Sequence, residues 1–281
     1  VRAIADQQRL IPDVLSDFLP AIKTYTDYRD MLSNEKLDMV YVTTPTSLHL
    51  PVISECVDKG ISFFVEKPLG TSSAECIPFI ESIRRKPVTN MVGYSKHYVD
   101  TFVKAKEILD SKVLGDLIHL NSYMRVSQMF TKGKGWRFKK ETSGGGVLNI
   151  LATHLVDLLM WFFGDIKYVN GNIQSYYSKD VEDFVHSYLV FNNGLEGCLD
   201  ASWSVRGYRL PEICIEVDAK DGKLVVTEDY LKIYSDKTTR WTTYYKQDLY
   251  KGVAVDIGGP EYTREDKHMA ESVLNNSDTQ I

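Results

Sequence analysis

The sequence predicts an α/β protein: a parallel sheet covered by helices, followed by an α+β domain with a large, mostly antiparallel sheet. Up to about residue 96, short apolar runs alternate with amphipathic segments in the rhythm of repeated βα units. Beyond Ile166, apolar and polar residues alternate with a period of two, and turn residues separate the runs. We therefore expect two domains, residues 1–96 and residues 97–281.

Composition and charge limit the class of protein. With 281 residues, 43% of them hydrophobic, the chain can bury a substantial core in one large or two moderate domains. The net charge of -5 argues against nucleic acid as the main partner, because phosphate binding needs clustered Lys and Arg, so a small molecule is expected. The four cysteines lack C-x-x-C spacing, which predicts reduced thiols in the cytoplasm and neither a disulfide framework nor a metal site. No apolar run approaches the roughly 20 residues of a membrane span, and no signal peptide is recognised.

Residues 1–6 have the pattern of a strand that ends in an acid. The second strand of a dinucleotide-binding unit ends in this way, and its acid accepts hydrogen bonds from the adenosine ribose hydroxyls. No G-x-G-x-x-G precedes Asp6, so either the first strand, glycine turn and helix are missing from this sequence, or Asp6 is only a surface strand end. Because a βα pattern follows, we expect a dinucleotide-binding domain without its first βα unit.

The other elements of the first domain follow from its apolar pattern. They are a helical connector at 12–19, a short helix at 28–32, a strand at 37–44, a helix at 48–59 closed by Gly60, a strand at 61–66, a helix at 72–85 and a strand at 88–94. Because helices separate the strands, the strands are predicted to be parallel.

Two polar loops follow strands of this sheet. The strand at 61–66 stops at Glu66, Lys67 and Pro68, and the chain must turn there because proline cannot continue a central strand. The loop at 43–49 follows the preceding strand. In an open parallel sheet, ligands bind beyond the carboxyl ends of the strands, so we expect both loops on one ligand-facing rim. For the loop at 43–49, ordinary strand-exit and helix N-cap chemistry explains the same residues equally well.

The second domain is predicted to begin with a helix at 98–109 and a strand at 117–126. A basic, glycine-spaced loop at 131–140 and three glycines at 144–146 then lead into a helix at 147–163. Glycines at that place would allow a ligand to approach the backbone at the helix start.

The predicted helix at 147–163 carries a candidate histidine. Ile150, His154, Asp157 and Trp161 fall on one helical face, so His154 and Asp157 can point together at whatever that face covers. A helical histidine with an acid three residues on is also a common structural pair, because helix neighbours at that spacing interact in any case. The preceding glycines favour the functional interpretation.

Antiparallel strands are expected at 167–178, 183–191, 195–203, 212–219, 223–227, 231–235 and 239–247. Asn193-Gly194 and Asp221-Gly222 supply the residues that tight hairpin turns require. A broad sheet of this kind has one apolar face, which helices or another subunit usually cover. An amphipathic segment at 264–274 follows.

In combination, these features resemble the glucose-fructose oxidoreductase and inositol dehydrogenase family over nearly the whole chain. The resemblance is carried by Glu66-Lys67-Pro68 at a strand end, a Thr-Pro-x-x-x-His loop at 44–49, and Gly144-Gly-Gly146 before a helix with His154-x-x-Asp157. An antiparallel domain follows in the same order as in the family. The individual motifs are short, and their order and spacing make the match specific.

The resemblance implies a Rossmann domain that binds a nicotinamide cofactor, and oxidation or reduction of a sugar or polyol hydroxyl in the cleft toward the second domain. The implied catalytic residues are Lys67, which would hydrogen-bond the reacting oxygen, and His154, which would hold or deprotonate the substrate hydroxyl. The implied cofactor-binding residues are Asp6, Thr44, Pro45, Thr46, His49, Glu66, Lys67, Pro68 in the cis form, Trp136 and Arg137. The implied substrate-binding residues are Lys67, Tyr94, Lys96, His97, His154 and Asp157.

The sequence departs from the family pattern at three places. The glycine fingerprint is absent. Many members have an aspartate four residues before the helix histidine, where this chain has Ile150, which leaves Asp157 to orient the His154 ring. Lys96 and His97 stand where members often carry an arginine.

Two features of the sequence bear on the choice between NAD and NADP and on the class of substrate. A carboxylate at Asp6 repels a 2'-phosphate and favours NAD, whereas Arg9 could recruit NADP. The basic loop at 131–140 would suit a phosphorylated or nucleotide-linked sugar, or it forms only a solvated surface.

We therefore expect an NAD(P)-dependent sugar or polyol oxidoreductase. One alternative is a non-catalytic regulator of the same fold that binds a dinucleotide or a sugar. Another is an enzyme that retains its cofactor and uses transient oxidation for hydrolysis or epimerisation. By resemblance, the protein would form homodimers or homotetramers through the second-domain sheet, with no nucleic-acid or membrane partner.

Overall fold

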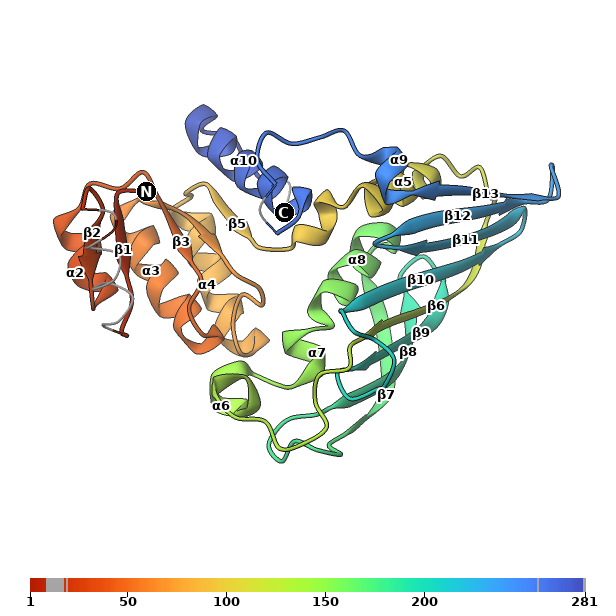
Figure 1. Cartoon of the computed structure of the whole chain (residues 1–281), viewed down its shortest axis with the longest axis horizontal. Helices are drawn as coiled ribbons and strands as arrows, with labels where there is room; N and C mark the ends of the chain where they lie inside the picture. The colour runs from red at the N-terminus through yellow and green to blue at the C-terminus, as the bar shows by residue number, and fades with distance from the viewer. Residues whose placement is uncertain (9–17, 19, 257, 280–281) are drawn as a thin grey trace.

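The first part of the chain builds parallel sheets covered by helices (Figure 1). The computed structural model describes residues 1–8, 18, 20–256 and 258–279. Within them, a three-stranded sheet has the order β3–β4–β5, and a separate two-stranded sheet pairs β1 with β2, all in parallel. The bounds are β1 Ala3–Ala5, β2 Lys23–Tyr25, α2 Tyr28–Asn34, β3 Met39–Val42, α3 His49–Lys59, β4 Ser62–Val65, α4 Ser73–Arg85 and β5 Asn90–Val92. The predicted parallel organisation is confirmed.

Local sequence signals fix the ends of the helices in this part. Gly60 ends α3 in the left-handed conformation, with φ +70°, and its N–H reaches the last carbonyls of the helix. A capping box starts α4, in which Ser72 and Glu75 each accept a hydrogen bond from the other's backbone N–H. Ile53 of α3 and Phe63 of β4 are buried in the core between helices and sheet.

Two differences from the sequence analysis lie in this part. No strand was predicted at Lys23–Tyr25, where the structure has β2. A strand of three residues is too short to give a periodic signal, and pairing with β1 decides its conformation. The connector predicted at 12–19 lies outside the described residues except for Phe18, and so does Arg9.

The second part is an eight-stranded sheet with helices packed on one face (Figure 1). The strand order is β13–β12–β11–β10–β6–β9–β8–β7, and all neighbours are antiparallel except the parallel pair β6 and β9. The main bounds are α5 Asp100–Asp110, β6 Leu117–Arg125, α8 Thr153–Phe163, β7 Ile166–Gln174, β8 Phe184–Phe191, β9 Glu196–Ser202, β10 Glu212–Ala219, β11 Gly222–Thr227, β12 Tyr230–Ser235 and β13 Arg240–Tyr245. The predicted large, mostly antiparallel sheet is confirmed.

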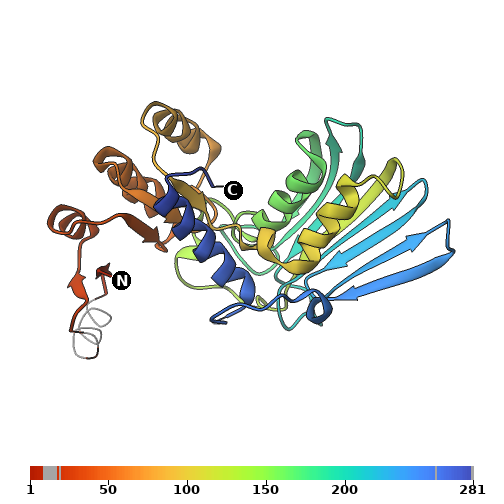
Figure 2. The same ribbon diagram turned by 90° about the horizontal axis from the view of Figure 1, so that it is seen from above.

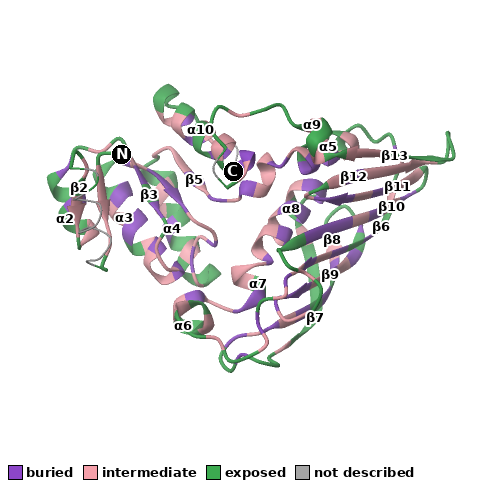
Figure 3. Ribbon diagram, viewed as in Figure 1, coloured by how far each residue is buried: buried purple, intermediate pink, exposed green. Residues whose placement is uncertain are grey.

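The core of this part and the edge strand β7 differ in burial (Figure 3). Leu155, Leu158 and Leu159 of α8 are fully buried in the core cluster that includes the sheet. Burying each of these side chains contributes roughly 1.5–3 kcal/mol. Along β7, by contrast, nearly all residues are exposed, including Tyr168 and Ile173.

The continuous helix predicted at 147–163 is wrong. The chain forms α7 at Val147–Ile150 and α8 at Thr153–Phe163, and the segment Lys140–Ile150 is bent by 52° relative to α8. At the break, Ala152 N–H donates to the carbonyl of Val147 instead of continuing the α-helical pattern. Contacts with residues distant in sequence set the directions of the two helix axes. At the start of α7, Val147 N–H donates to the carbonyl of Glu182, whereas α8 is oriented by the packing of its buried apolar face in the core. Ile150 and His154 therefore lie on different helices.

Four short helical segments complete the described residues of the second part. A 3-10 turn, η2 at Ser95–Tyr98, precedes α5, so the predicted start at 98 shifts to Asp100. The loop before α7 contains η3 at Trp136–Phe138 and α6 at Lys140–Ser143, and α9 at Lys246–Leu249 follows β13.

The last helix of the described residues, α10 at Pro260–Asn275, packs against the three-stranded parallel sheet β3–β4–β5 (Figure 2). Met269 of α10 is buried against Phe64 of β4 and Met91 of β5. The division proposed at residue 96 thus separates the two sheets, while α10 packs on the first of them.

In the described part of the chain, none of the helices alone has the length and apolar character of a membrane span; the bent pair Lys140–Ile150 and Thr153–Phe163 meets that test by length and composition alone.

Candidate active site

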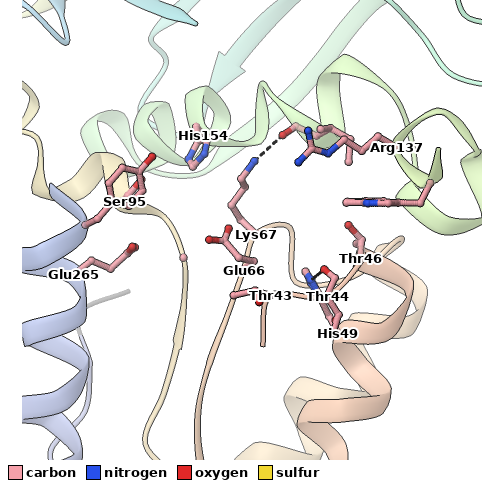
Figure 4. A pocket seen from close by; sticks show the side chains of 14 residues that line it. Thr43, Thr44, Thr46, His49, Glu66, Lys67, Ser95, Arg137, His154 and Glu265 are labelled. Atoms are coloured by element: carbon pink, nitrogen blue, oxygen red, sulfur yellow. Dashed lines mark hydrogen bonds between the residues drawn. The ribbon is translucent and has the colours of Figure 1, made fainter. Parts of the chain in front are cut away.

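A cavity of about 410 Å³ lies between the carboxyl ends of the parallel strands and the start of α8 (Figure 4). The lining residues from the first domain follow β3, β4 and β5, and those from later in the chain come from η3, α7, α8 and α10. The predicted site residues that line it are Thr44, Thr46, His49, Glu66, Lys67, Trp136, Arg137 and His154. The arrangement agrees with the rule that ligands bind beyond the carboxyl ends of parallel strands.

Lys67 reaches into the cavity from the end of β4. The peptide bond between Lys67 and Pro68 is cis, as the resemblance implied. The ammonium of Lys67 donates a 2.7 Å hydrogen bond to the backbone carbonyl of Ile150. The pKa of Lys67 is lowered from 10.5 to about 8, chiefly by burial; the negative charge of Glu66 opposes this shift, and the positive charges of Arg137 and Lys96 add to it. Lys67 can therefore exchange a proton close to neutral pH.

His154 faces the same cavity from the first turn of α8. Its Nδ1 is buried and has no hydrogen-bond partner among the described residues. Burial, followed by the positive charge of Lys67, holds the pKa of His154 well below its ordinary value of 6.5. The ring is consequently neutral at pH 7 and can accept or donate a single hydrogen bond at each nitrogen. The ring of Tyr94 meets it edge-on at a centroid distance of 6.0 Å.

The expectation that Asp157 orients His154 is wrong. The carboxylate of Asp157 accepts a 2.7 Å hydrogen bond from Nε2 of His97 instead. His97 also stacks on Trp161, with ring centroids 4.2 Å apart. His154 and Asp157 both lie on α8, so the helix break does not separate them; instead η2 brings His97 against α8, which sequence spacing alone did not show.

Four residues predicted to bind substrate lie outside the cavity lining, and each has a partner in the protein. Lys96 forms a 2.9 Å ion pair with Glu228. The hydroxyl of Tyr94 shares a 2.9 Å hydrogen bond with that of Thr153. His97 and Asp157 bind each other as described above. Through these contacts Tyr94, Lys96 and His97 join the segment after β5 to the second domain.

The loop after β3 supplies buried hydroxyls. Oγ1 of Thr44 and Oγ1 of Thr46 are both buried without a hydrogen-bond partner in the described part of the chain, and both residues line the cavity. Unpaired buried hydroxyls cost about 1–3 kcal/mol each, so a polar ligand group is expected to pair with them. Nδ1 of His49 lies 2.8 Å from the carbonyl of Pro68, and Nε2 lies 2.9 Å from that of Thr44. His49 therefore ties the two strand-end loops together.

On the other wall, Trp136 and Arg137 lie on η3, with the guanidinium of Arg137 5.5 Å from the centroid of the Trp136 ring. Arg137 is exposed at the edge of the cavity. Lys132, Lys134, Lys139 and Lys140 of the same loop are exposed as well.

The triple glycine serves the fold rather than a ligand at the helix start. A Cβ on Gly144 would collide with the backbone of Thr71, and one on Gly146 with the backbone of Glu182. The carboxylate of Glu182 accepts hydrogen bonds from the N–H groups of Gly146 and Leu148, at 2.8 and 2.9 Å. The glycines were predicted to let a ligand approach the backbone closely, but here the backbones of Thr71 and Glu182 occupy that space.

The cavity also has lining residues that the sequence analysis missed. They are Thr43, Gly93, Ser95, Ile150, Tyr262 and Glu265. Thr43, Gly93 and Ser95 follow strands of the parallel sheet, so the strand-end rule could have found them. Tyr262 and Glu265 come from α10, for which the amphipathic pattern gave no direction of packing.

Asp6 lies apart from the cavity, at the end of β1, where it accepts a 2.7 Å hydrogen bond from Gln8 N–H. Pro45 and Pro68 belong to the two strand-end loops without lining the cavity themselves.

Comparisons with known proteins agree with this architecture. Residues 16–94 match a family model described as the oxidoreductase family with an NAD-binding Rossmann fold, and residues 102–225 match the GFO/IDH/MocA C-terminal domain. Oxidoreductase P35 of Formosa agariphila is 25% identical over 193 residues, which cover 67% of this chain and 59% of that protein. Levoglucosan dehydrogenase of Pseudarthrobacter phenanthrenivorans is 22% identical over 226 residues, which cover 71% of this chain and 58% of that protein. The chain thus spans less than two thirds of the length of these relatives.

The solved structures show the same fold. A levoglucosan dehydrogenase in complex with NADH and levoglucosan superposes with a TM-score of 0.88 at 20% identity, over 99% of this chain and 82% of that one. GenD2 from gentamicin A biosynthesis, in complex with NAD, gives a TM-score of 0.80 at 22% identity, over 100% of this chain and 81% of that one.

Proposed function

The chain belongs to the GFO/IDH/MocA oxidoreductase family, and from this premise we propose that it transfers a hydride between NAD(P) and a hydroxyl- or keto-bearing carbon of a sugar, polyol or nucleotide sugar. The observation that carries the proposal is that Lys67 and His154, from different domains, line one cavity. Neither motif alone would distinguish an enzyme from a protein that only binds dinucleotide.

The cavity has suitable groups for a nicotinamide cofactor. The unpaired hydroxyls of Thr44 and Thr46 would bind its polar groups, with Glu66 and Trp136 beside them. When bound, the cofactor supplies the hydride acceptor or donor, so the protein provides positioning and electrostatics. Asp6 at the end of β1 supports NAD over NADP, because a carboxylate at that position repels a 2'-phosphate.

Lys67 and His154 would handle the proton. In the oxidation direction, the reacting hydroxyl would donate its proton to the neutral amine of Lys67, whose pKa of about 8 allows this near neutral pH. In the reduction direction, the ammonium would donate to the carbonyl oxygen and stabilise the alkoxide that develops. His154, neutral and with a free Nδ1, would hold the substrate hydroxyl rather than carry a charge.

Ile150, which stands where many family members have an aspartate, gives a reason to consider a second candidate function, that of a non-catalytic regulator. A dinucleotide- or sugar-binding regulator would not need the aspartate that Ile150 replaces. In this structure, however, the backbone carbonyl of residue 150 holds the ammonium of Lys67, and a carbonyl is present whatever the side chain is. The loss of the aspartate therefore leaves Lys67 anchored, which favours the enzyme.

The test is an absorbance assay of nicotinamide reduction and oxidation. The full-length protein would be incubated with NAD or NADP and a panel of neutral sugars, polyols and nucleotide sugars. We expect turnover with at least one member of the panel and its loss in Lys67→Ala, while that variant still binds the cofactor. Cofactor binding without turnover across the panel would favour the regulator, and cofactor retained through gel filtration would favour transient oxidation.

We also propose that the exposed face of the eight-stranded sheet mediates a homodimer or homotetramer. Tyr168 of β7 and Tyr188 of β8 are exposed on it, and apolar surface of this kind is typical of an interface. Light scattering of the wild type and of Tyr168→Glu would show whether copies of the protein associate through this face; a monomeric wild type would refute the proposal.

A further inference from the structure

Glu265 of α10 brings an unpaired carboxyl group into the cavity from the far end of the sequence. The residue is 4% exposed and lines the cavity, and its Oε1 has no hydrogen-bond partner in the described part of the chain. In Figure 4 its side chain points from the helix toward Glu66. A buried carboxyl oxygen without a partner is costly, so a ligand group is expected to complete it.

The groups around Glu265 favour its neutral form. Burial raises the pKa of Glu265 to about 8, and the negative charges of Glu66 and Asp266 contribute, whereas Lys96 acts in the opposite direction. The phenols of Tyr41 and Tyr98 are close enough to feel the charge of this carboxyl, and burial, the largest cause, raises the pKa of both, so they stay neutral too. At pH 7 the carboxyl therefore carries a proton and can both donate and accept a hydrogen bond.

The position of Glu265 indicates which end of a ligand it meets. Its neighbours in the cavity wall, Glu66, Gly93 and Ser95, follow β4 and β5 of the dinucleotide-binding domain. The helix is fixed there because Met269 packs into that sheet. His154 and Arg137, in contrast, belong to the second domain. A group bound at Glu265 therefore lies over the parallel sheet, on the cofactor side of Lys67.

We propose that Glu265 binds the carboxamide of the nicotinamide ring, donating through its hydroxyl to the amide carbonyl and accepting from the amide N–H. A carboxylic acid and a primary amide each present one donor and one acceptor in one plane, so two hydrogen bonds can form at once. A carboxylate could only accept. The inference rests on the proposed function, and it assigns Glu265 the role of holding the ring in a fixed orientation beside Lys67.

The test compares two ligands that differ in the nicotinamide ring. NADH and ADP-ribose share the adenosine diphosphate part, and only NADH carries the carboxamide. Calorimetric titration of the full-length protein would measure both in the wild type, Glu265→Ala and Glu265→Gln. We expect Glu265→Ala to weaken NADH binding about tenfold and to leave ADP-ribose binding unchanged, because two modest hydrogen bonds are lost. Glu265→Gln should retain most of the NADH affinity, since an amide can pair with an amide.

Titration with pH gives an independent readout. The NADH affinity of the wild type should fall as the pH rises through about 8, when the carboxyl loses its proton, and Glu265→Gln should lack this fall. Lys67 is present in both proteins, so its own titration cancels in the comparison. Glu271→Ala, which removes an exposed carboxyl from the same helix, is the matched control and should behave as the wild type.

Three results would overturn the assignment. Equal weakening of NADH and ADP-ribose by Glu265→Ala would indicate a general structural role. Unchanged NADH affinity with a raised KM for the sugar would place the carboxyl on the substrate. If the wild type binds neither ligand, the proposed function fails first and the assignment fails with it.

Discussion

Replacing Lys67 by methionine is expected to abolish turnover and, at about pH 7, to stabilise the fold. Burial lowers the pKa of the Lys67 ammonium from 10.5 to about 8, which means that the folded protein disfavours its charge. At about 1.4 kcal/mol for each pH unit, the cost to the free energy of unfolding is about 3 kcal/mol. The variant also loses the hydrogen bond to the carbonyl of Ile150, a loss of about 1 kcal/mol. The net gain is therefore about 2 kcal/mol.

The stabilisation by Lys67→Met is expected to depend on pH. The cost of the buried ammonium is fully present below the folded pKa of about 8, and it disappears as the pH rises toward the unfolded value of 10.5. The stability difference between Lys67→Met and the wild type should therefore shrink across that interval.

Urea unfolding followed by tryptophan fluorescence, at about pH 7 and about pH 10, would measure this difference. Lys237→Met, which removes an exposed lysine, is the control and should change stability little at either pH. In the hydride-transfer assay, Lys67→Met should lose about 10²–10⁴-fold in kcat. A variant less stable than the wild type at about pH 7, or a difference that persists to about pH 10, would show that the ammonium is not held at a cost.

Three further predictions follow from single contacts. Gly146→Ala places a methyl group on the backbone of Glu182 and should lower stability by about 1–3 kcal/mol in thermal denaturation. Gly145→Ala should lower stability less, because the nearest atoms to its methyl group belong to side chains, with Asn149 Cβ at 3.3 Å; equal effects would refute the packing argument. Glu35→Gln should destabilise the protein at neutral pH, because hydrogen bonds and ion pairs lower the pKa of Glu35 to about 2, and the difference should vanish in acid titration between 4.5 and about 2. His154 is neutral throughout, so the pH–rate profile should lack an inflection near 6.5; an inflection there that His154→Gln removes would contradict the predicted role.

The sequence predicted the features that depend on residues close together in the chain. Gly60 and the Ser72 capping box fix helix ends through neighbours within one turn, and alternation of apolar and polar residues with a period of two identified the large sheet. Glu66-Lys67-Pro68 was placed at a strand end by the same local logic. Since parallel strands share one rim, this sufficed to predict a ligand site beside Lys67.

Tertiary structure decided the features that depend on residues far apart in the chain. Periodicity could not show that Asp157 pairs with His97, or that the backbone of Glu182 approaches Gly146, because each partner comes from another element. The break between α7 and α8 has the same origin. The start of α7 bonds to the backbone of Glu182 and α8 packs in the core, and these distant contacts give the two helices different directions.

The carboxyl of Glu265 is the clearest example of this limit. Its helix has an amphipathic pattern that any packed helix would have, and the pattern gives no partner. Only the packing of Met269 on the parallel sheet brings that carboxyl to the cavity. The sequence by itself thus determined the fold class, the helix ends and the rim on which Lys67 stands, because these follow from neighbouring residues. The tertiary structure determined which side chains share the cavity and what charge they carry, because burial and proximity to remote groups set both.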